Sequence, residues 1–209
     1  MMPEVRFTPL LIVISAPSGG GKTTLCHRLL AASDNMTRAI TCTTRAPRPG
    51  EKDGVDYYFL DASAFRKHVK DGSFLEHATV YGKSYGTLKA EVLEKLRGGR
   101  DVLLNVDVQG AAAIRSQTEE LPELKQALVT VFITPDSLRV LEERLRKRGQ
   151  DSEVSIRKRM SVARQEIAQW KSFDYLIVST TIEEDLRRMQ AILAAQRMRT
   201  NHAKPPLSE

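Results

Sequence analysis

The feature that most constrains the fold of this chain is an apolar run that leads directly into a glycine-rich turn. Residues 10–14 are all apolar, and the segment that follows them ends in Gly21-Lys22-Thr23. A strand before such a turn is typical of a phosphate-binding loop. Its glycines let consecutive N–H groups point inward, and the next helix presents its positive end to the same anion. The segment predicts a nucleoside triphosphate site.

Within this loop we expect Lys22 to reach the β- and γ-phosphates and the Thr23 hydroxyl to ligate Mg²⁺. Ala16 departs from the strict motif, which begins with glycine. A plain surface turn is the alternative, but it does not explain the preceding strand or the helical spacing of Leu25 and Leu29. The residues expected to bind the triphosphate are Ala16, Pro17, Ser18, Gly19, Gly20, Gly21, Lys22, Thr23 and Thr24.

Length and composition restrict the class of protein. A chain of 209 residues, 41% hydrophobic and 28% charged, fits one globular domain with insertions. No apolar stretch approaches the roughly 18 residues of a membrane span, and the N-terminus lacks signal-peptide anatomy. Cys26 and Cys42 are the only cysteines, so we expect no disulfide framework and predict the cytoplasm as the compartment.

The net charge of +6 raises the question of nucleic-acid binding. No RNA- or DNA-binding motif accompanies this charge, and the basic residues gather where anionic substrates are expected. We therefore predict small-molecule partners, with no nucleic acid and no membrane, and the sequence leaves the oligomeric state undetermined. The four histidines are scattered without metal-ligand spacing, which favours structural or exposed roles.

Short apolar runs that alternate with helical patterns predict an α/β fold with a parallel sheet and helices on both faces. The expected strands are residues 10–14, 102–106, 128–133 and 175–178, and a helical pattern follows each one. We expect the core to comprise residues 1–40, 88–136 and 171–199, with a flexible tail at 200–209.

Two segments interrupt this alternation. Residues 41–87 hold a Pro- and Gly-rich stretch and strand-like runs at 57–60 and 74–80 around a helical segment at 65–69, which predicts a small mixed α+β insertion. Residues 137–170 are helical and predict a lid. One helical face there, expected to pack in the core, comprises Ile156, Met160, Ala163, Ile167 and Trp170.

The first insertion begins with two arginines three residues apart, Arg45 and Arg48, and Pro47 stiffens the chain between them. A guanidinium fork makes bidentate, charge-assisted hydrogen bonds with phosphate oxygens, so both side chains can converge on one dianionic group. Taken alone, a solvated basic loop explains the pair equally well.

Further motifs follow along the chain, namely Asp53-Gly54-Val55-Asp56-Tyr57-Tyr58-Phe59, Phe74-Leu75-Glu76, Tyr81-Gly82-Lys83-Ser84-Tyr85-Gly86-Thr87 and Asp107-Val108-Gln109-Gly110. With the phosphate loop and the string Thr-Thr-Arg-x-Pro-Arg-x-Gly-Glu, this series resembles the guanylate kinase family over about residues 8–190. Members of that family transfer the γ-phosphate of ATP to GMP. The resemblance implies a P-loop core for ATP and Mg²⁺, a GMP-binding insertion that also takes dGMP, and an arginine-bearing lid.

The resemblance also implies roles for the acceptor-site residues. The GMP phosphate would be held by Arg45, Arg48, Tyr57 and Tyr85, and the guanine ring would be read by Thr41, Glu76 and Thr87. A carboxylate accepts hydrogen bonds from guanine N1–H and the exocyclic amine together, and adenine has no such donor pair. Such sites reject analogues that lack the donors by as much as roughly 10⁴-fold. Without its flanking motif, we would interpret Glu76 as an exposed carboxylate on a strand.

Residues 102–107 resemble the family's second nucleotide-site strand. Asp107 matches an acid position that contacts the substrate base or supports the metal shell. Asn105 stands where the family usually has Asp or Glu, so it keeps an oxygen acceptor without the charge. We therefore assign Mg²⁺ to Thr23 and the phosphates, with water in the remaining positions. On the adenine side, Ser179 and Thr180 replace the family's Asn-Asp.

The predicted lid is strongly basic, with nine Lys and Arg against four Asp and Glu between residues 139 and 164. Its arginines that match the family are Arg144, Arg148 and Arg159. An arginine supplied in cis contributes roughly 10³-fold or more to phosphoryl transfer. A solvated face explains the remaining side chains better, namely Arg146, Lys147, Arg157 and Lys158. The groups expected to be catalytic are Lys22, Arg45, Arg144, Arg148 and Arg159.

Two other functions remain open from the sequence. One is a guanylate-kinase-like module that binds partner proteins without catalysis, and the other is a kinase for a different nucleoside monophosphate. The complete Gly21-Lys22-Thr23 argues against the first, because a module without catalysis has no need of an ATP loop.

Overall fold

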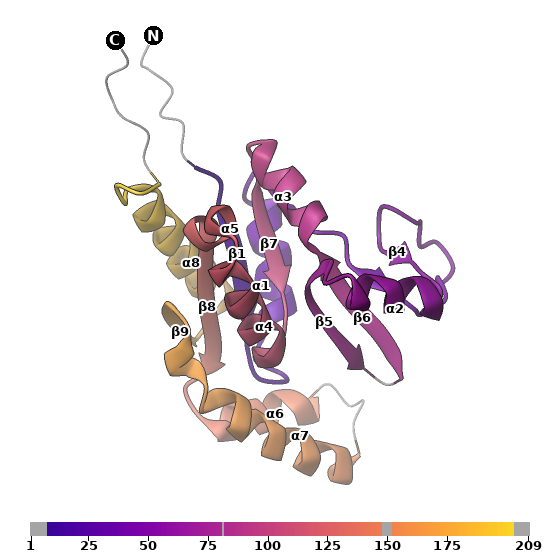
Figure 1. Cartoon of the computed structure of the whole chain (residues 1–209). Helices are drawn as coiled ribbons and strands as arrows, with labels where there is room; N and C mark the ends of the chain where they lie inside the picture. Colours follow the sequence, from indigo (N-terminus) through magenta and orange to yellow (C-terminus); the bar gives the residue numbers. More distant parts are fainter. Residues whose placement is uncertain (1–7, 81, 148–151, 203–209) are drawn as a thin grey trace.

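The computed structural model describes residues 8–80, 82–147 and 152–202 and confirms the α/β fold (Figure 1). Within these residues the main sheet has the strand order β2-β7-β1-β8-β9, and all of its strand pairs are parallel. Its strands are β1 (Leu11–Ser15), β2 (Met36–Arg38), β7 (Asp101–Asn105), β8 (Leu128–Pro135) and β9 (Tyr175–Ser179).

Four of these strands lie within two residues of their predicted positions, and β2 was not predicted because it is only three residues long. Strand β9 is apolar in sequence but not fully buried, because Leu176 and Val178 are each 40% exposed. Strand β9 forms the edge of the sheet, so only alternate residues such as Ile177 reach the core, where Ile177 packs with Met189.

Side chains of the central strand alternate between two hydrophobic clusters. On one face Ile12 and Ile14 pack against α1 (Lys22–Ala31) and α8 (Ile182–Arg197). On the other face Val13 joins a cluster with three further helices, α3 (Lys89–Arg97), α4 (Val108–Glu119) and α5 (Pro122–Ala127). Burial of both faces explains why the parallel strands read as continuous apolar runs.

A second, mixed sheet lies beside the main one, on the right in Figure 1. Its strands are β3 (Cys42–Thr43), β4 (Tyr58–Phe59), β5 (Phe74–Val80) and β6 (Lys83–Leu88), in the order β4-β3-β6-β5. Strands β3 and β4 are parallel, whereas β6 pairs antiparallel with β3 and β5. Helix α2 (Ala62–Lys70) is capped by Asp61, whose Oδ1 accepts from two backbone amides.

Helices α6 (Leu138–Lys147) and α7 (Glu153–Ile167) lie beyond the carboxyl ends of the main strands, at the bottom of Figure 1. Ile156 and Ala163 are buried, as predicted for their helical face. The same prediction is wrong for Trp170, which is 40% exposed in a 3₁₀ turn (Trp170–Ser172), because α7 ends before it. Among the described residues, no helix is long and apolar enough to cross a membrane.

His202, in the segment expected to be a tail, is buried, whereas Thr200 and Asn201 are exposed. His202 is 2% exposed, and its carbonyl oxygen accepts a hydrogen bond from the Thr8 amide at 3.0 Å. Residues 203–209 of the expected flexible tail lie outside the described residues.

Candidate active site

The predicted phosphate loop connects β1 to α1. Gly19 and Gly21 have φ values of +88° and +94°, a backbone conformation that side chains rarely adopt, which explains glycine at both positions. The Gly20 amide donates to the Pro17 carbonyl at 2.8 Å. A Cβ at position 20 would lie 2.9 Å from the Cβ of Ala16, so the absence of a side chain at Gly20 is what accommodates the alanine.

Lys22 extends from the loop to the end of β7. Its Nζ donates to the carbonyl oxygen of Val106 at 2.8 Å. Burial lowers the pKa of Lys22, and the carboxylates of Asp107 and Glu166 partly offset this effect. The lysine therefore links the phosphate loop to the strand end that carries Asp107. Neither the Val106 carbonyl nor Glu166 was predicted from the sequence.

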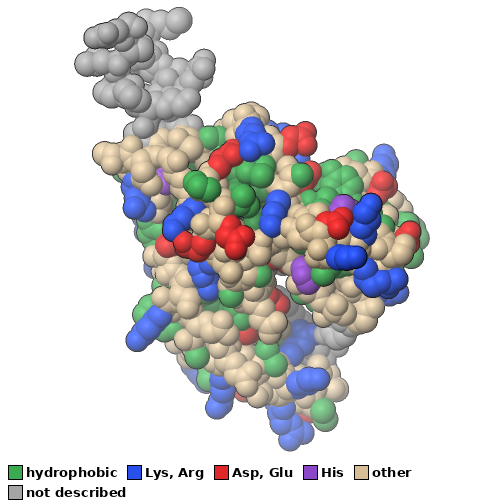
Figure 2. All heavy atoms as spheres, in the orientation of Figure 1, with side chains coloured by type: hydrophobic (Ala, Val, Ile, Leu, Met, Phe, Trp, Pro, Cys, Tyr) green, Lys and Arg blue, Asp and Glu red, His purple; other side chains and the backbone are tan. Residues whose placement is uncertain are grey.

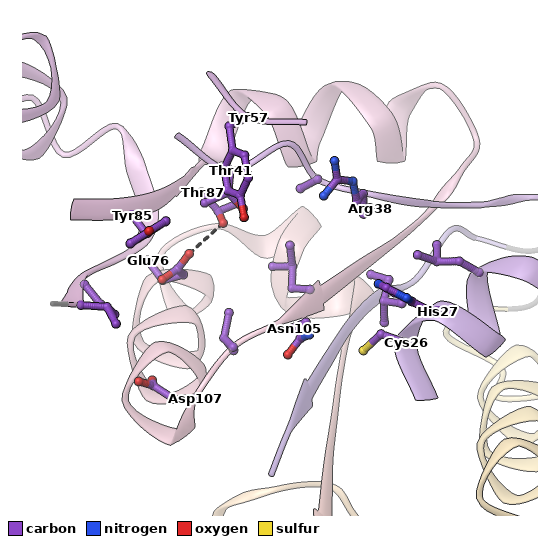
Figure 3. A pocket seen from close by; sticks show the side chains of 17 residues that line it. Cys26, His27, Arg38, Thr41, Tyr57, Glu76, Tyr85, Thr87, Asn105 and Asp107 are labelled. Atoms are coloured by element: carbon purple, nitrogen blue, oxygen red, sulfur yellow. Dashed lines mark hydrogen bonds between the residues drawn. The ribbon is translucent and has the colours of Figure 1, made fainter. Parts of the chain in front are cut away.

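A cavity of about 340 Å³ lies between the two sheets (Figure 3). Its lining brings together six of the predicted acceptor-site residues, Thr41, Tyr57, Glu76, Tyr85, Thr87 and Asp107. Asn105, His27 and Arg38 also line it, and the last two were not predicted. In Figure 3 Glu76 and Thr87 point toward each other on one side, while His27 and Arg38 lie on the other.

The predicted guanine-reading residues Glu76 and Thr87 face each other on paired strands β5 and β6. The Thr87 hydroxyl donates to Glu76 Oε1 at 2.7 Å, and Glu76 is only 9% exposed. Burial raises the pKa of Glu76, the Thr87 hydrogen bond opposes this, and repulsion from Asp107 adds to it. A carboxylate held in this way keeps Oε2 and the remaining acceptor capacity of Oε1 for hydrogen bonds from a ligand.

Asp107 caps helix α4, where its Oδ1 accepts from the Gly110 amide at 2.8 Å. A Cβ on Gly110 would meet Asp107 Oδ1 and Glu76 Oε2, both at 3.5 Å. The tight neighbour of that added Cβ would be Val106, whose own Cβ would lie 3.0 Å from it, whereas 3.5 Å is an ordinary contact distance. The two carboxylates stand near each other at the same end of the cavity.

Arg45 lies beside the cavity and does not line it. Its Nη2 donates to both carboxylate oxygens of Glu51, at 2.8 and 2.9 Å, and its guanidinium lies 5.3 Å from the Tyr57 ring centre. The Arg48 amide donates to Glu51 Oε2 at 2.7 Å, while the Arg48 side chain is exposed. Hydrogen bonding to Arg45 lowers the pKa of Glu51, so it is an anion at neutral pH. Sequence reasoning gave Glu51 no role, although it ends the Thr-Thr-Arg-x-Pro-Arg-x-Gly-Glu string.

The structure places the arginines of the predicted lid differently from one another. Arg144 Nη1 lies 3.9 Å from where a Cβ of Gly21 would stand, which puts it beside the phosphate loop. Arg159 is half-buried on α7, and Arg148 lies outside the described residues. Several basic side chains stand out on the surface of α6 and α7, among other and hydrophobic ones (Figure 2). The four predicted to form a solvated face are exposed, namely Arg146, Lys147, Arg157 and Lys158.

The predicted metal residue Thr23 has a neutral neighbour. Asn105 Nδ2 lies 3.5 Å from Thr23 Oγ1, and both side chains offer an oxygen of the hard type that Mg²⁺ prefers. In the described part of the chain no group of three His, Cys, Asp or Glu residues could hold a metal ion. The side chains present fit a Mg²⁺ that is held largely by nucleotide phosphates.

The residues on the expected adenine side are engaged within the fold. Ser179 Oγ donates to Asp185 Oδ2 at 2.6 Å, and the Thr180 amide donates to the other oxygen of the same carboxylate at 3.2 Å. Asp185 thus holds the turn between β9 and α8, and it was not predicted.

A parallel sheet with a Gly-Lys-Thr loop after its first strand, and a cavity lined by residues predicted for the acceptor site, define a P-loop nucleoside monophosphate kinase. The family model described as guanylate kinase matches residues 8–196. The chain belongs to the guanylate kinase family and is an ATP:GMP phosphotransferase.

Individual relatives agree with this assignment. The guanylate kinase of Coxiella burnetii is 44% identical over 95% of this chain and 93% of its own length. That of Anaeromyxobacter dehalogenans is 45% identical over 94% of this chain and 84% of its own length. The crystal structure of guanylate kinase from Anaplasma phagocytophilum has a TM-score of 0.71 and 32% identity, covering 95% of this chain and 92% of that one.

Proposed function

We propose that this enzyme phosphorylates GMP and dGMP by direct in-line transfer, with the monophosphate in the cavity between the two sheets. The buried Glu76 carries this proposal. It is fixed by Thr87, and a carboxylate at this place can accept from guanine N1–H and the exocyclic amine together. Thr41 and Thr87 line the same cavity, and their hydroxyls would contact the ring. Adenine, cytosine and uracil lack that pair of donors.

The GMP phosphate would lie against Arg45, Arg48, Tyr57 and Tyr85. Arg45 already holds an anion, the Glu51 carboxylate, and it packs on the Tyr57 ring. A phosphate that replaces or shares this carboxylate would keep the same charge-assisted geometry. Arg48 lies three residues along the same loop, and its exposed side chain has the freedom to close on the ligand.

The triphosphate of ATP would lie on the loop from Ala16 to Thr24, and Lys22 would turn from Val106 to the β- and γ-phosphates. Thr23, with Asn105 beside it, would hold Mg²⁺ together with the phosphates. When bound, the ion neutralises charge on the phosphate oxygens.

The lid would complete the site by supplying positive charge around the transferred group. We assign this role to Arg144, Arg148 and Arg159. We also propose the division into a core, a GMP-binding insertion at 41–87 and a lid at 137–170. Closure of insertion and lid would exclude water, so that ATP is not simply hydrolysed. No covalent intermediate on the enzyme is needed, because positioning and electrostatics supply the rate.

We place the enzyme in the cytoplasm, where thiols stay reduced. Cys26 and Cys42 are both unpaired and buried, in keeping with that compartment.

A coupled assay of ADP release tests the function. The purified chain is offered GMP, dGMP, AMP, CMP and UMP with ATP and Mg²⁺. We expect turnover with the two guanine nucleotides, and kcat/KM lower by at least about 10³-fold with the others. Equal turnover with AMP would reject the guanine-reading role of Glu76.

A further inference from the structure

The two lid helices touch the phosphate loop at consecutive residues. Glu166, the penultimate residue of α7, accepts a hydrogen bond on Oε2 from the Ser18 amide at 3.2 Å. The two residues are 148 positions apart in the sequence. Glu166 has no part in the site as assigned above, and yet it contacts the loop on which ATP binding depends.

Helix α6 packs on the next residue of the loop. A Cβ on Gly19 would lie 3.0 Å from Leu145 Cδ2 and 3.3 Å from Leu141 Cδ1. Both leucines are fully buried. The loop at Ser18 and Gly19 is therefore held between a polar contact from α7 and an apolar contact from α6.

The surroundings of Glu166 act on its charge in both directions. Burial raises the pKa of Glu166, while the Ser18 amide and Lys22 lower it and Asp107 raises it. The same attraction is seen from the lysine, because Glu166 and Asp107 both support the charged form of Lys22. The loop lysine is thus bracketed by a carboxylate from β7's end and a carboxylate from the lid.

The amides of the loop divide into two groups. The Ser18 and Gly20 amides donate to protein acceptors, Glu166 and the Pro17 carbonyl. In the described part of the chain the Gly19 and Gly21 amides have no protein acceptor, which leaves them for an anion. Glu166 therefore satisfies an amide within the loop's own framework.

We propose that Glu166 is a positioning residue for ATP: from the lid it holds the Ser18 amide and so fixes the loop in its phosphate-binding conformation. This inference rests on the proposed assignment of the loop to ATP. The competing interpretation is that Glu166 stands in the place of a phosphate and leaves when ATP binds. The two interpretations predict opposite changes in ATP affinity when the carboxylate is removed.

The test measures Kd for ATP and for GMP separately, by calorimetric titration of the full chain with Mg²⁺ present, together with KM and kcat. Glu166→Ala is expected to raise Kd for ATP about tenfold and to leave Kd for GMP unchanged. Glu166→Gln is expected to recover most of the affinity, because an amide oxygen accepts the same hydrogen bond. Gln165→Ala, at the exposed neighbouring position of α7, is the matched control and should bind ATP normally.

Tighter or unchanged ATP binding by Glu166→Ala would overturn the proposal, and so would Glu166→Gln as weak as the alanine variant. Should Glu166→Ala fail to fold, the glutamine variant and its separate KM values for ATP and GMP still decide. Lys22→Ala distinguishes a failure of the loop assignment from a failure of the role proposed for Glu166. If it binds ATP normally, the loop assignment itself fails. If it loses ATP affinity while Glu166→Ala does not, only the role of Glu166 fails.

Discussion

The Nζ of Lys22 and the carbonyl oxygen of Val106 lie 2.8 Å apart, which joins the phosphate loop to the strand end that precedes Asp107. The lysine side chain is partly desolvated there, and its pKa is lowered. Because its charge has only partial compensation from nearby carboxylates, a triphosphate is an effective competitor for its N–H donors.

We predict that Lys22→Ala lowers kcat by about 10²-fold or more, since it removes a cation that stabilises charge on the transferred phosphoryl group. The Kd for GMP should stay unchanged, because Lys22 does not line the acceptor cavity. Steady-state kinetics and GMP titration check both statements. Near-normal kcat in this variant would contradict the assignment of the loop.

Glu76→Gln should damage GMP use selectively. An amide presents one acceptor and one donor group, so it cannot accept from both guanine donors, and we expect kcat/KM for GMP to fall roughly 10³-fold or more. The KM for ATP should be unchanged, because Glu76 lines the cavity between the two sheets and is not part of the phosphate loop. An equal loss for both substrates would indicate damage to the fold instead.

The raised pKa of Glu76 also links stability and pH. The folded state binds the Glu76 proton more tightly than the unfolded state, so this contribution to stability is complete below the ordinary value of 4.5 and is lost as pH rises through the raised pKa. Glu76→Gln should therefore raise Tm at pH 8 and change it little at pH 4. Thermal unfolding at both pH values tests this, and a lower Tm at pH 8 would contradict it.

Protonation of Glu76, which stabilises the folded state, should weaken GMP binding. Only the ionised carboxylate accepts both guanine donors, so GMP affinity should fall with acidity in a window above pH 4.5, where an ordinary glutamate is still ionised. The Kd for GMP between pH 5 and 8 measures this. Glu76→Gln is the control: its weaker binding should keep the dependence that comes from titration of the GMP phosphate and lose the additional fall that comes from Glu76.

Arg45→Lys should raise KM for GMP by about tenfold or more while KM for ATP stays unchanged. Lysine keeps the charge, but it lacks the planar fork that holds Glu51 and packs on the Tyr57 ring. Arg187→Lys is the matched control, because Arg187 forms a surface ion pair with Glu184 on α8, and both KM values should be unchanged in this variant. A normal KM for GMP in Arg45→Lys would remove Arg45 from the acceptor site.

The sequence predicted those parts of the site that depend on local strings. Gly21-Lys22-Thr23 and the run from Arg45 to Tyr57 carry their own turn and charge signals, so their residues could be named from spacing and resemblance. The strand pairing that joins Glu76 to Thr87 needed the tertiary structure, although both were named. Glu166 and the Val106 carbonyl could not be found in advance, because a lone acid in a helix and a backbone oxygen have no distinctive pattern.

The errors in the fold have similar causes. Trp170 continues the apolar spacing of α7, but the helix ends at Ile167. Beyond that residue the helical spacing no longer places side chains on one face. Strand β9 is apolar along its length, and its exposure follows from a place at the sheet edge that only the strand order reveals. Strand β2 gives too short a signal to be distinguished from a loop.

The separation of 148 positions between Ser18 and Glu166 has a consequence for biosynthesis. During synthesis the glycine-rich segment leaves the ribosome long before the acid that fixes it, so a nascent chain carries an incomplete cradle while most of the remaining polypeptide is translated. A contact of such long range stabilises the chain only after the entropy cost of closing the intervening loop has been met. Competence to bind ATP should therefore be among the last properties that the growing chain acquires.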